Sequence, residues 1–113
     1  MNLNKIVKFI LNKLPETPQS AVIIGSGLGN IISLLEEPIH IKYKDIPQHP
    51  HNDLLGHNSE WVFGYFYGKP IICANGRFHY YEGFLLEETT TTVLVINSLD
   101  CKKILITNAS GCL

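Results

Sequence analysis

The sequence predicts an α/β fold with a mixed, largely parallel sheet that is flanked by helices. Residues 21–24 form a short apolar run of mainly branched side chains, and a glycine turn at 25–29 and a segment with helical spacing follow directly. This order of strand, glycine turn and helix is typical of α/β proteins. Residues 104–107 form a second apolar run that suits a buried strand. Both observations favour a sheet that is covered on its faces.

The first half of the chain contains clear helix and strand patterns. Apolar residues recur at helical spacing in residues 4–14, with lysines and an asparagine on the other face, so we expect an amphipathic helix that ends before Pro15. The elements expected next are a buried strand, a helix that ends before Pro38 and a further strand, at residues 21–24, 31–37 and 39–43.

A long loop and a hairpin are expected in the middle of the chain. Residues 45–58 are rich in Pro, His, Asn and Gly, a composition typical of exposed loops. The β-prone runs 61–67 and 70–74 are separated by Gly68-Lys69, which predicts a two-residue hairpin turn.

Residues 85–99 give conflicting signals. Their apolar register fits a helix, but four consecutive threonines have poor helix propensity. We favour the helix, because the register extends over the whole segment.

Composition limits the class of protein. The chain has 113 residues, 45% hydrophobic and 17% charged, with a formal net charge of -1, and no linker or repeat interrupts it, so we expect one globular domain over residues 1–113. No basic stripe is present to bind nucleic acid, and no apolar run reaches the roughly 20 residues that span a membrane. Three cysteines without a CxxC pair indicate neither a disulfide framework nor a zinc ribbon, which favours a reducing cytoplasm.

The glycine turn at 25–29 is a candidate anion site. A turn between a strand and a helix presents free N–H groups and the positive end of the helix dipole, and Ser26 adds a hydroxyl donor. It does not match the dinucleotide fingerprint, because Asn30 stands where the last glycine would be. A tight turn that binds no ligand explains this segment equally well.

Residues 76–83 carry the densest group of reactive side chains. Arg77 offers a planar guanidinium that matches phosphate oxygens, and His79 can donate a further hydrogen bond. The alternative is a polar loop in which Arg77 and Glu82 form a surface ion pair, a kind of pair that contributes little.

Two further segments contain candidate ligand groups. His57 follows Gly56 in the long loop and could reach the same anion, whereas His49 and His51 are expected to be solvated loop side chains, since the loop lacks a familiar metal-ligand spacing. Residues 108–111 place small residues after an apolar strand, where ligands of open α/β sheets bind, although a simple turn is the alternative.

Taken together and in this order, these segments resemble the trimeric purine nucleoside phosphorylase family, which also includes methylthioadenosine phosphorylase. The matching segments are the glycine turn, Gly56-His57, the GRxHxYEG motif and the strand end, at residues 25–29, 56–57, 76–83 and 107–111. The ending Tyr81-Glu82-Gly83 favours the purine nucleoside branch. By this resemblance the chain would be the N-terminal, phosphate-binding portion of a nucleoside phosphorylase fold.

The resemblance also implies roles for individual residues. Tyr81 would face the ribose, and His79 and Glu82 would be catalytic, with Glu82 ordering the phosphate network. Phosphate would be held by Ser26, His57, Arg77, His79 and the backbone N–H of Ala109. The implied reaction is phosphorolysis of purine ribonucleosides and deoxyribonucleosides to the free base and a pentose 1-phosphate, in purine salvage. No metal or organic cofactor is implied, phosphate is the co-substrate, and a homotrimer is the family's assembly.

The chain departs from the family in two respects. Cys112 stands where the family has a small residue, and the chain stops at Leu113, whereas family members continue through strands that read the purine. We therefore expect an incomplete fold and a truncated product whose base preference cannot be read from this sequence. The rival hypotheses are a noncatalytic phosphate- or nucleotide-binding module and a non-functional remnant with uncovered apolar strands.

Overall fold

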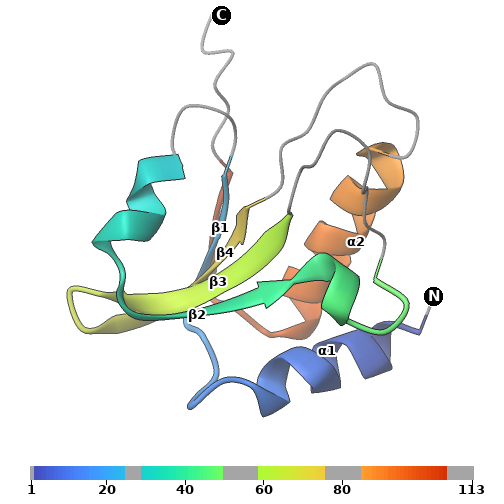
Figure 1. The fold of residues 1–113 in the computed structure, drawn as a ribbon, viewed down its shortest axis with the longest axis horizontal. Helices are drawn as coiled ribbons and strands as arrows, with labels where there is room; N and C mark the ends of the chain where they lie inside the picture. The colour runs from blue at the N-terminus through green and yellow to red at the C-terminus, as the bar shows by residue number, and fades with distance from the viewer. Residues whose placement is uncertain (1, 25–28, 50–58, 76–84, 107–113) are drawn as a thin grey trace, which may run out of the picture.

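A mixed five-stranded sheet organises the part of the chain that the computed structural model describes, residues 2–24, 29–49, 59–75 and 85–106 (Figure 1). The strand order is β2-β3-β4-β1-β5. Along the chain the elements are α1 (Leu3–Asn12), β1 (Ser20–Ile23), the 3-10 helix η1 (Gly29–Leu34), β2 (Glu36–Lys42), the 3-10 helix η2 (Tyr43–Asp45), β3 (Glu60–Phe66), β4 (Lys69–Asn75), α2 (Leu85–Ser98) and β5 (Lys103–Ile106). β1 is parallel to β4 and to β5, and the other pairings are antiparallel, so the predicted mixed α/β sheet is confirmed.

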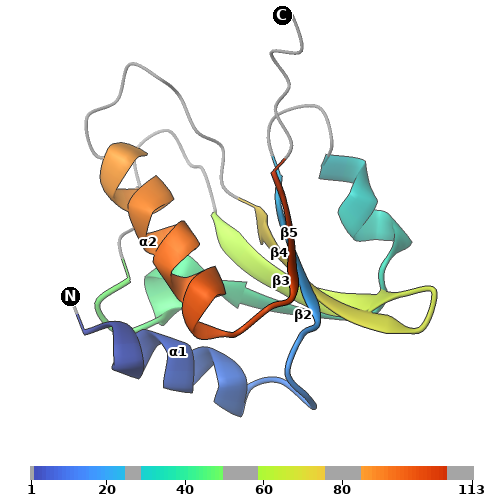
Figure 2. The same cartoon turned by 180° about the vertical axis from the view of Figure 1, so that it is seen from behind.

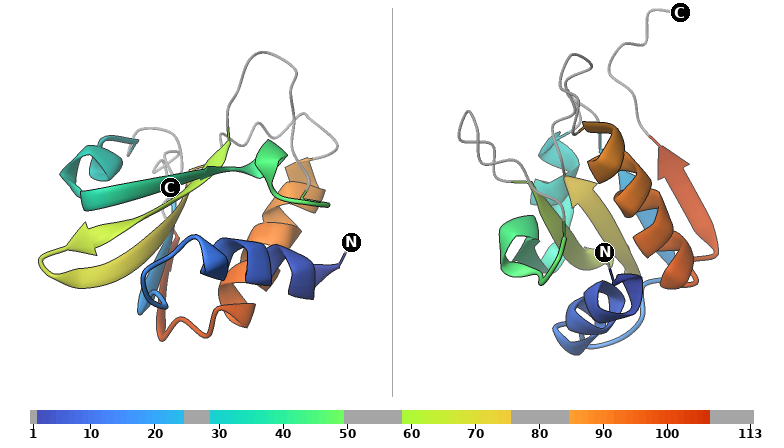
Figure 3. Two further views of the ribbon diagram at one scale, coloured as in Figure 1. Left: turned by 60° about the horizontal axis from the view of Figure 1, so that its bottom comes forward. Right: turned by 90° about the vertical axis from the view of Figure 1, so that its right-hand side faces the viewer.

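The two faces of the sheet are covered differently. α1 and α2 lie on one face, where their apolar side chains meet those of β1 to β4 (Figure 3). η1 contributes Ile31 and Ile32 to a smaller cluster on the other face. In β1, Ala21 and Ile23 belong to the first cluster and Val22 to the second, so successive side chains are buried on opposite faces. This explains why the strand reads as an uninterrupted apolar run.

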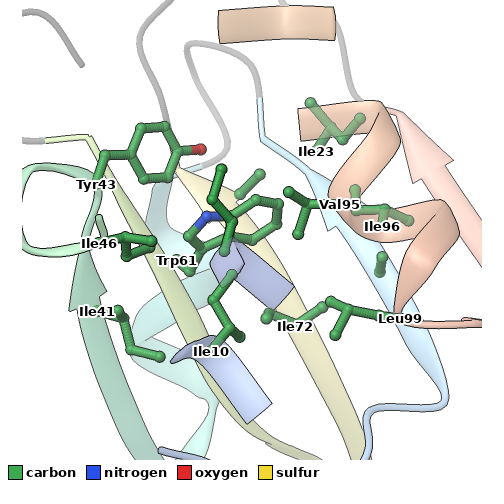
Figure 4. Packing of buried hydrophobic residues seen from close by; sticks show 13 residues of the cluster. Ile10, Ile23, Ile41, Tyr43, Ile46, Trp61, Ile72, Val95, Ile96 and Leu99 are labelled. Carbon is green, nitrogen blue, oxygen red and sulfur yellow. The ribbon is translucent and has the colours of Figure 1, made fainter. Parts of the chain in front are cut away.

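Trp61 lies within the larger cluster. Its side chain is fully buried, and Figure 4 shows it with Tyr43 and Ile46 on one side and Val95 on the other. The buried members of this cluster are Ile6, Ile10, Ala21, Ile23, Ile41, Tyr43, Ile46, Trp61, Ile72, Ala74, Val95, Ile96 and Leu99. This cluster therefore joins both helices to β1, β2, β3 and β4.

The predicted hairpin is confirmed, with its turn one residue earlier than expected. Phe66 pairs with Lys69, so the two turn residues are Tyr67 and Gly68 rather than Gly68 and Lys69. Both have positive φ, 52° and 78°, as the mirror-image turn that suits twisted strands requires.

The helix expected at 85–99 is also confirmed. Thr91 and Thr92 are buried in α2 together with Val95 and Ile96, and Leu99, which follows the helix, is buried as well. The threonines thus lie on the packed side of the helix, where tertiary contacts outweigh their poor propensity.

The expected helix at 31–37 is wrong in its extent. The structure has a 3-10 helix that ends at Leu34, and Glu36 and Glu37 already belong to β2. A proline disfavours the α-helical conformation of the residue before it, so the helix could not run up to Pro38. Glu37 has a φ of 53°, and the pairing of β2 with β3 shifts register between Glu36 and Ile39.

The expected burial of the last strand is also wrong. Ile104 is 48% exposed and Leu105 58% exposed. β5 lies at the edge of the sheet and pairs with β1, its one neighbour among the described strands. A run of apolar residues predicts a strand, but it does not tell how many neighbours the strand has.

Within the described ranges, no helix is both long and apolar enough to cross a bilayer.

Candidate functional site at one edge of the sheet

Three described strands end at the same edge of the sheet, which is the edge formed by the carboxyl ends of its parallel strands. β4, β1 and β5 are parallel neighbours, and Ile23 near the end of β1 lies opposite Ala74 of β4 and Ile106 of β5. The carboxyl ends of parallel strands point to one edge, which Figure 2 shows for β5 and β4. The described residues that directly precede three of the four family-like motifs, Ile24, Asn75 and Ile106, therefore lie at this edge.

The fourth motif reaches the sheet at the same edge. β3 is antiparallel to β4, and its first residue, Glu60, lies opposite Asn75, the last residue of β4. Residues 50–58, which include Gly56-His57, directly precede this strand start. The described residues that adjoin all four motifs thus lie at one edge of the sheet, although they are far apart in sequence.

The ends of the central strands are held firmly at this edge. Ile23 and Ile24 are 7% and 2% exposed, and the backbone N–H of Ile24 donates to the carbonyl of Ala74 at 3.0 Å. This hydrogen bond continues the pairing of β1 with β4 past the last residue of β1. The chain therefore enters the glycine turn from a buried and paired backbone.

The predicted site side chains themselves lie outside the described residues. This holds for Ser26, His57, Arg77, His79, Tyr81, Glu82 and Ala109, and also for Cys112 and His51. Their roles stay predictions. So do the three alternatives, which are the ligand-free glycine turn, the surface ion pair between Arg77 and Glu82, and the simple turn at 108–111.

A compact segment leads into residues 50–58. Residues 43–49 form two successive turns, in which the N–H of Ile46 donates to the carbonyl of Tyr43 and the N–H of His49 donates to that of Ile46, each at 3.1 Å. This spacing of three directs Tyr43, Ile46 and His49 into the protein, where they are 0%, 2% and 3% exposed. The expectation of an exposed loop is therefore wrong for Ile46 and His49, whereas Asp45, Pro47 and Gln48 are exposed as expected.

His49 is a buried hydrogen-bond acceptor rather than a solvated loop side chain. Trp61 Nε1 donates to His49 Nε2 at 3.0 Å, and the His49 and Tyr43 rings lie 4.1 Å apart between centroids. An indole N–H can only donate, so Nε2 of His49 carries no proton in this arrangement. This contact was not predicted from the sequence. The spacing of three between Tyr43, Ile46 and His49 could have indicated that these side chains share one buried side, near the chain's one tryptophan.

The described titratable groups near the sheet do not form a reactive centre. Burial raises the pKa of the Cys73 thiol to about 12, so the thiol is protonated at neutral pH and is a poor nucleophile. His40 Nδ1 lies 3.1 Å from Glu60 Oε2 in an exposed pair. Among the described side chains, no three His, Cys, Asp or Glu residues are grouped so that they could hold a metal ion.

Known proteins resemble this chain over nearly its whole length. The purine nucleoside phosphorylase 1 of Bacillus subtilis is 38% identical over 109 residues, which are 96% of this chain and 40% of the relative. Isoform 2 of the Schistosoma mansoni enzyme, solved with cytosine and ribose-1-phosphate, superposes with a TM-score of 0.85 at 34% identity, over 95% of this chain and 38% of that one. Another Schistosoma mansoni structure, solved with inosine, has a TM-score of 0.81 at 28% identity and covers 95% and 37%.

No protein-family model matches the chain. The similar sequences and the similar structures nevertheless agree, because both are proteins named purine nucleoside phosphorylase. The chain spans about two fifths of the length of the relatives it matches. We conclude that this chain is a homologue of part of the purine nucleoside phosphorylase fold.

Proposed function

We propose that this chain binds inorganic phosphate at the edge where β1, β4 and β5 end. We propose further that this is the phosphate site of a purine nucleoside phosphorylase. In the proposed site, Ser26, His57, Arg77, His79 and the N–H of Ala109 hold the anion. The observation that carries the proposal is that the described residues adjoining all four motifs lie at one edge. Open α/β sheets bind their ligands outside the carboxyl ends of their strands, which supports this choice of edge.

The proposed reaction is phosphorolysis of a purine nucleoside. An oxygen of phosphate forms a bond to the anomeric carbon while the bond from that carbon to the purine nitrogen breaks. The purine leaves with the electron pair of the broken bond and takes up a proton, and a pentose 1-phosphate remains. Phosphate held against the sugar places the nucleophile and stabilises the positive charge that develops on the sugar ring.

Separate groups serve the sugar and the anion in this proposal. Tyr81 faces the ribose, His79 donates to the phosphate, and Glu82 orders the groups around it. Phosphate is a co-substrate, and the proposed chemistry requires neither a metal nor an organic cofactor. The relative solved with cytosine and ribose-1-phosphate supports a site that holds a phosphorylated pentose beside a base.

The assembly and the cellular location belong to the same proposal. A homotrimer follows from the resemblance to the trimeric family, and a reducing cytoplasm fits a chain whose described cysteines, Cys73 and Cys101, are both free thiols. The formal net charge of -1 disfavours nucleic acid as a partner.

Calorimetric titration with phosphate, followed by inosine, tests the proposal. Charge-assisted hydrogen bonds contribute about 1.5–3 kcal/mol, so Arg77→Ala should weaken phosphate binding roughly 10- to 100-fold. Lys69→Ala is the matched control, because Lys69 is an exposed cation at the opposite end of β4. Phosphate binding without release of the base would identify a noncatalytic phosphate-binding module. A wild-type chain that does not bind phosphate would contradict the proposal.

A further inference from the structure

The described part of the chain contains two histidines, and their surroundings differ. His49 is 3% exposed, whereas the His40 side chain is 48% exposed and its Nδ1 lies 3.1 Å from Glu60 Oε2. A proton on His40 would lie beside water and a carboxylate. A proton on His49 would place a positive charge inside the protein, where a charge is costly.

The contact between His49 and Trp61 depends on a neutral imidazole. Trp61 Nε1 donates to His49 Nε2 at 3.0 Å, and the His49 and Tyr43 rings lie 4.1 Å apart between centroids. A protonated imidazole carries an N–H on both nitrogens and accepts no hydrogen bond. A proton on Nε2 would therefore set two donors against each other, and the indole N–H would lose its acceptor.

The other titratable groups on the surrounding elements do not alter this result. Tyr43 faces the His49 ring with its phenol ring, and Glu60, next to Trp61 on β3, lies with its carboxylate at His40. The charged side chains of α1 and η2 are exposed: Lys5, Lys8, Lys44 and Asp45. Whatever further group faces the ring, a proton on Nε2 removes the acceptor of the Trp61 N–H.

The segment that carries His49 is held in its conformation by contacts with the rest of the fold. The N–H of Tyr43 donates to the carbonyl of Ser59 at 3.0 Å, and Gln48 Oε1 accepts from the backbone N–H of Asn2 at 2.7 Å. Gln48 has a φ of 66°, which is uncommon for a residue other than glycine and persists only where its surroundings maintain it. Loss of the His49 contact would therefore favour release of the segment.

We propose that residues 43–49 form a pH-sensitive switch, in which protonation of His49 releases this segment from Trp61 while the sheet stays folded. The inference goes beyond the proposed function, because it concerns a contact in the core and requires no phosphate. A released imidazole in water has a pKa of about 6.5. The closed form, which needs the neutral ring, is therefore favoured above this pH, and release becomes up to about tenfold more favourable for each pH unit below it.

An NMR titration of the full chain from pH 8 to pH 5 tests the switch. Because Trp61 is the chain's one tryptophan, its indole N–H gives a single identifiable signal. We expect this signal and the ring protons of His49 to change together, with one midpoint below about pH 6.5. An indole signal that stays constant over this range, or two different midpoints, would overturn the inference.

Two variants assign the response to His49. Glutamine can accept a hydrogen bond through its side-chain oxygen but does not titrate, so His49→Gln should abolish the pH response of the indole signal. His40→Gln is the matched control, because it removes the exposed histidine and should leave the response as in the wild type. A response that persists in His49→Gln would show that another group causes it. If His49→Gln does not fold, the wild-type comparison of the two midpoints still decides.

Amide hydrogen exchange distinguishes local release from unfolding of the whole chain. The N–H groups of Tyr43 and Ile46 donate to the carbonyls of Ser59 and Tyr43, and the N–H of Ile24 donates to Ala74 within the sheet. Below the midpoint, the protection factors of Tyr43 and Ile46 should fall by up to about tenfold per pH unit, while that of Ile24 is retained. A parallel fall at all three amides would mean global unfolding, and unchanged protection at Tyr43 and Ile46 would mean no release. Either result overturns the switch.

Discussion

Gly64 lies in β3 directly against Leu35 and against Glu36, the first residue of β2. A Cβ atom at this position would be 2.7 Å from the Cβ of Leu35 and 3.3 Å from the carbonyl oxygen of Glu36. The Cβ of Leu35 and the carbonyl oxygen of Glu36 cannot move aside by rotation of a side chain, so the clash could be relieved only by a shift of the backbone. The close packing of β3 against this segment therefore depends on glycine.

We predict that Gly64→Ala lowers the free energy of unfolding by about 1–3 kcal/mol, the usual cost of overpacking a buried site. Alanine is otherwise no worse than glycine in a strand, so the loss would come from the contact with Leu35. Urea unfolding of the two chains measures the difference. A variant as stable as the wild type would mean that Leu35 moves away at little cost.

A second residue gives a pH-dependent prediction. Burial raises the pKa of Cys73 from the ordinary 9.0 to about 12, so the folded chain holds the thiol proton where the unfolded chain releases it. The contribution to stability is complete below pH 9 and is lost as the pH rises from 9 towards 12. The slope from this thiol approaches about 1.4 kcal/mol per pH unit.

Comparison with Cys73→Ala isolates this slope from the other groups that titrate at high pH. The alanine variant should be less stable at neutral pH, because it leaves a small cavity in the core. The difference between the two chains should shrink as the pH rises above 9. A constant difference over this range would show that the thiol ionises in the folded chain as readily as in the unfolded one.

At the scale of elements, α1 starts at a defined cap. The side chain of Asn2 accepts a hydrogen bond through Oδ1 from the backbone N–H of Lys5 at 3.2 Å. The backbone N–H of Asn2 donates to Gln48 Oε1 at 2.7 Å. The helix buries Ile6 and Ile10 completely. The cap thus joins the start of a packed helix to the segment that leads to His49.

We predict that Asn2→Ala lowers the free energy of unfolding by about 1 kcal/mol, as the loss of a helix cap does. Asn2→Asp is the matched control, because aspartate retains the acceptor and the backbone donor is unchanged. Chemical denaturation should show most of the wild-type stability in the aspartate variant. Equal losses in both variants would contradict a capping role for the side chain.

Which elements could be predicted from the sequence depends on where their signals lie. α1 has apolar residues at helical spacing along its whole length, so local periodicity was sufficient. In α2 the four threonines oppose the periodicity, and the helix depends on tertiary contacts that bury Thr91 and Thr92. η1 is a short 3-10 helix, and its end at Leu34 depends on Pro38 and on the irregular start of β2. The burial of His49 depends on a contact with Trp61, in another element, which no local pattern contains.

At the scale of the whole molecule, the strand order places the candidate site. The motifs could be found in the sequence, but their common edge depends on β4, β1 and β5 being parallel neighbours and on β3 returning beside β4. Apolar runs do not specify an order of strands. They also do not show which strand lies at an edge, which is why Ile104 and Leu105 were expected to be buried.

The outer edge of β5 leads to the last prediction. Ile104 and Leu105 are 48% and 58% exposed, on a strand that pairs with one described neighbour. Backbone groups and apolar side chains at such an edge favour pairing with another chain, and charged side chains prevent it. We therefore predict that Leu105→Lys lowers the concentration-dependent association of this chain, measured by sedimentation or light scattering.

Val93→Lys separates the edge from the added charge. Val93 is 45% exposed on α2, so its replacement changes the net charge equally but leaves β5 as it is. Association that falls in Leu105→Lys and persists in Val93→Lys would locate the contact at β5. An equal fall in both variants would indicate that net charge alone controls association, because long-range repulsion acts without regard to the position of the lysine.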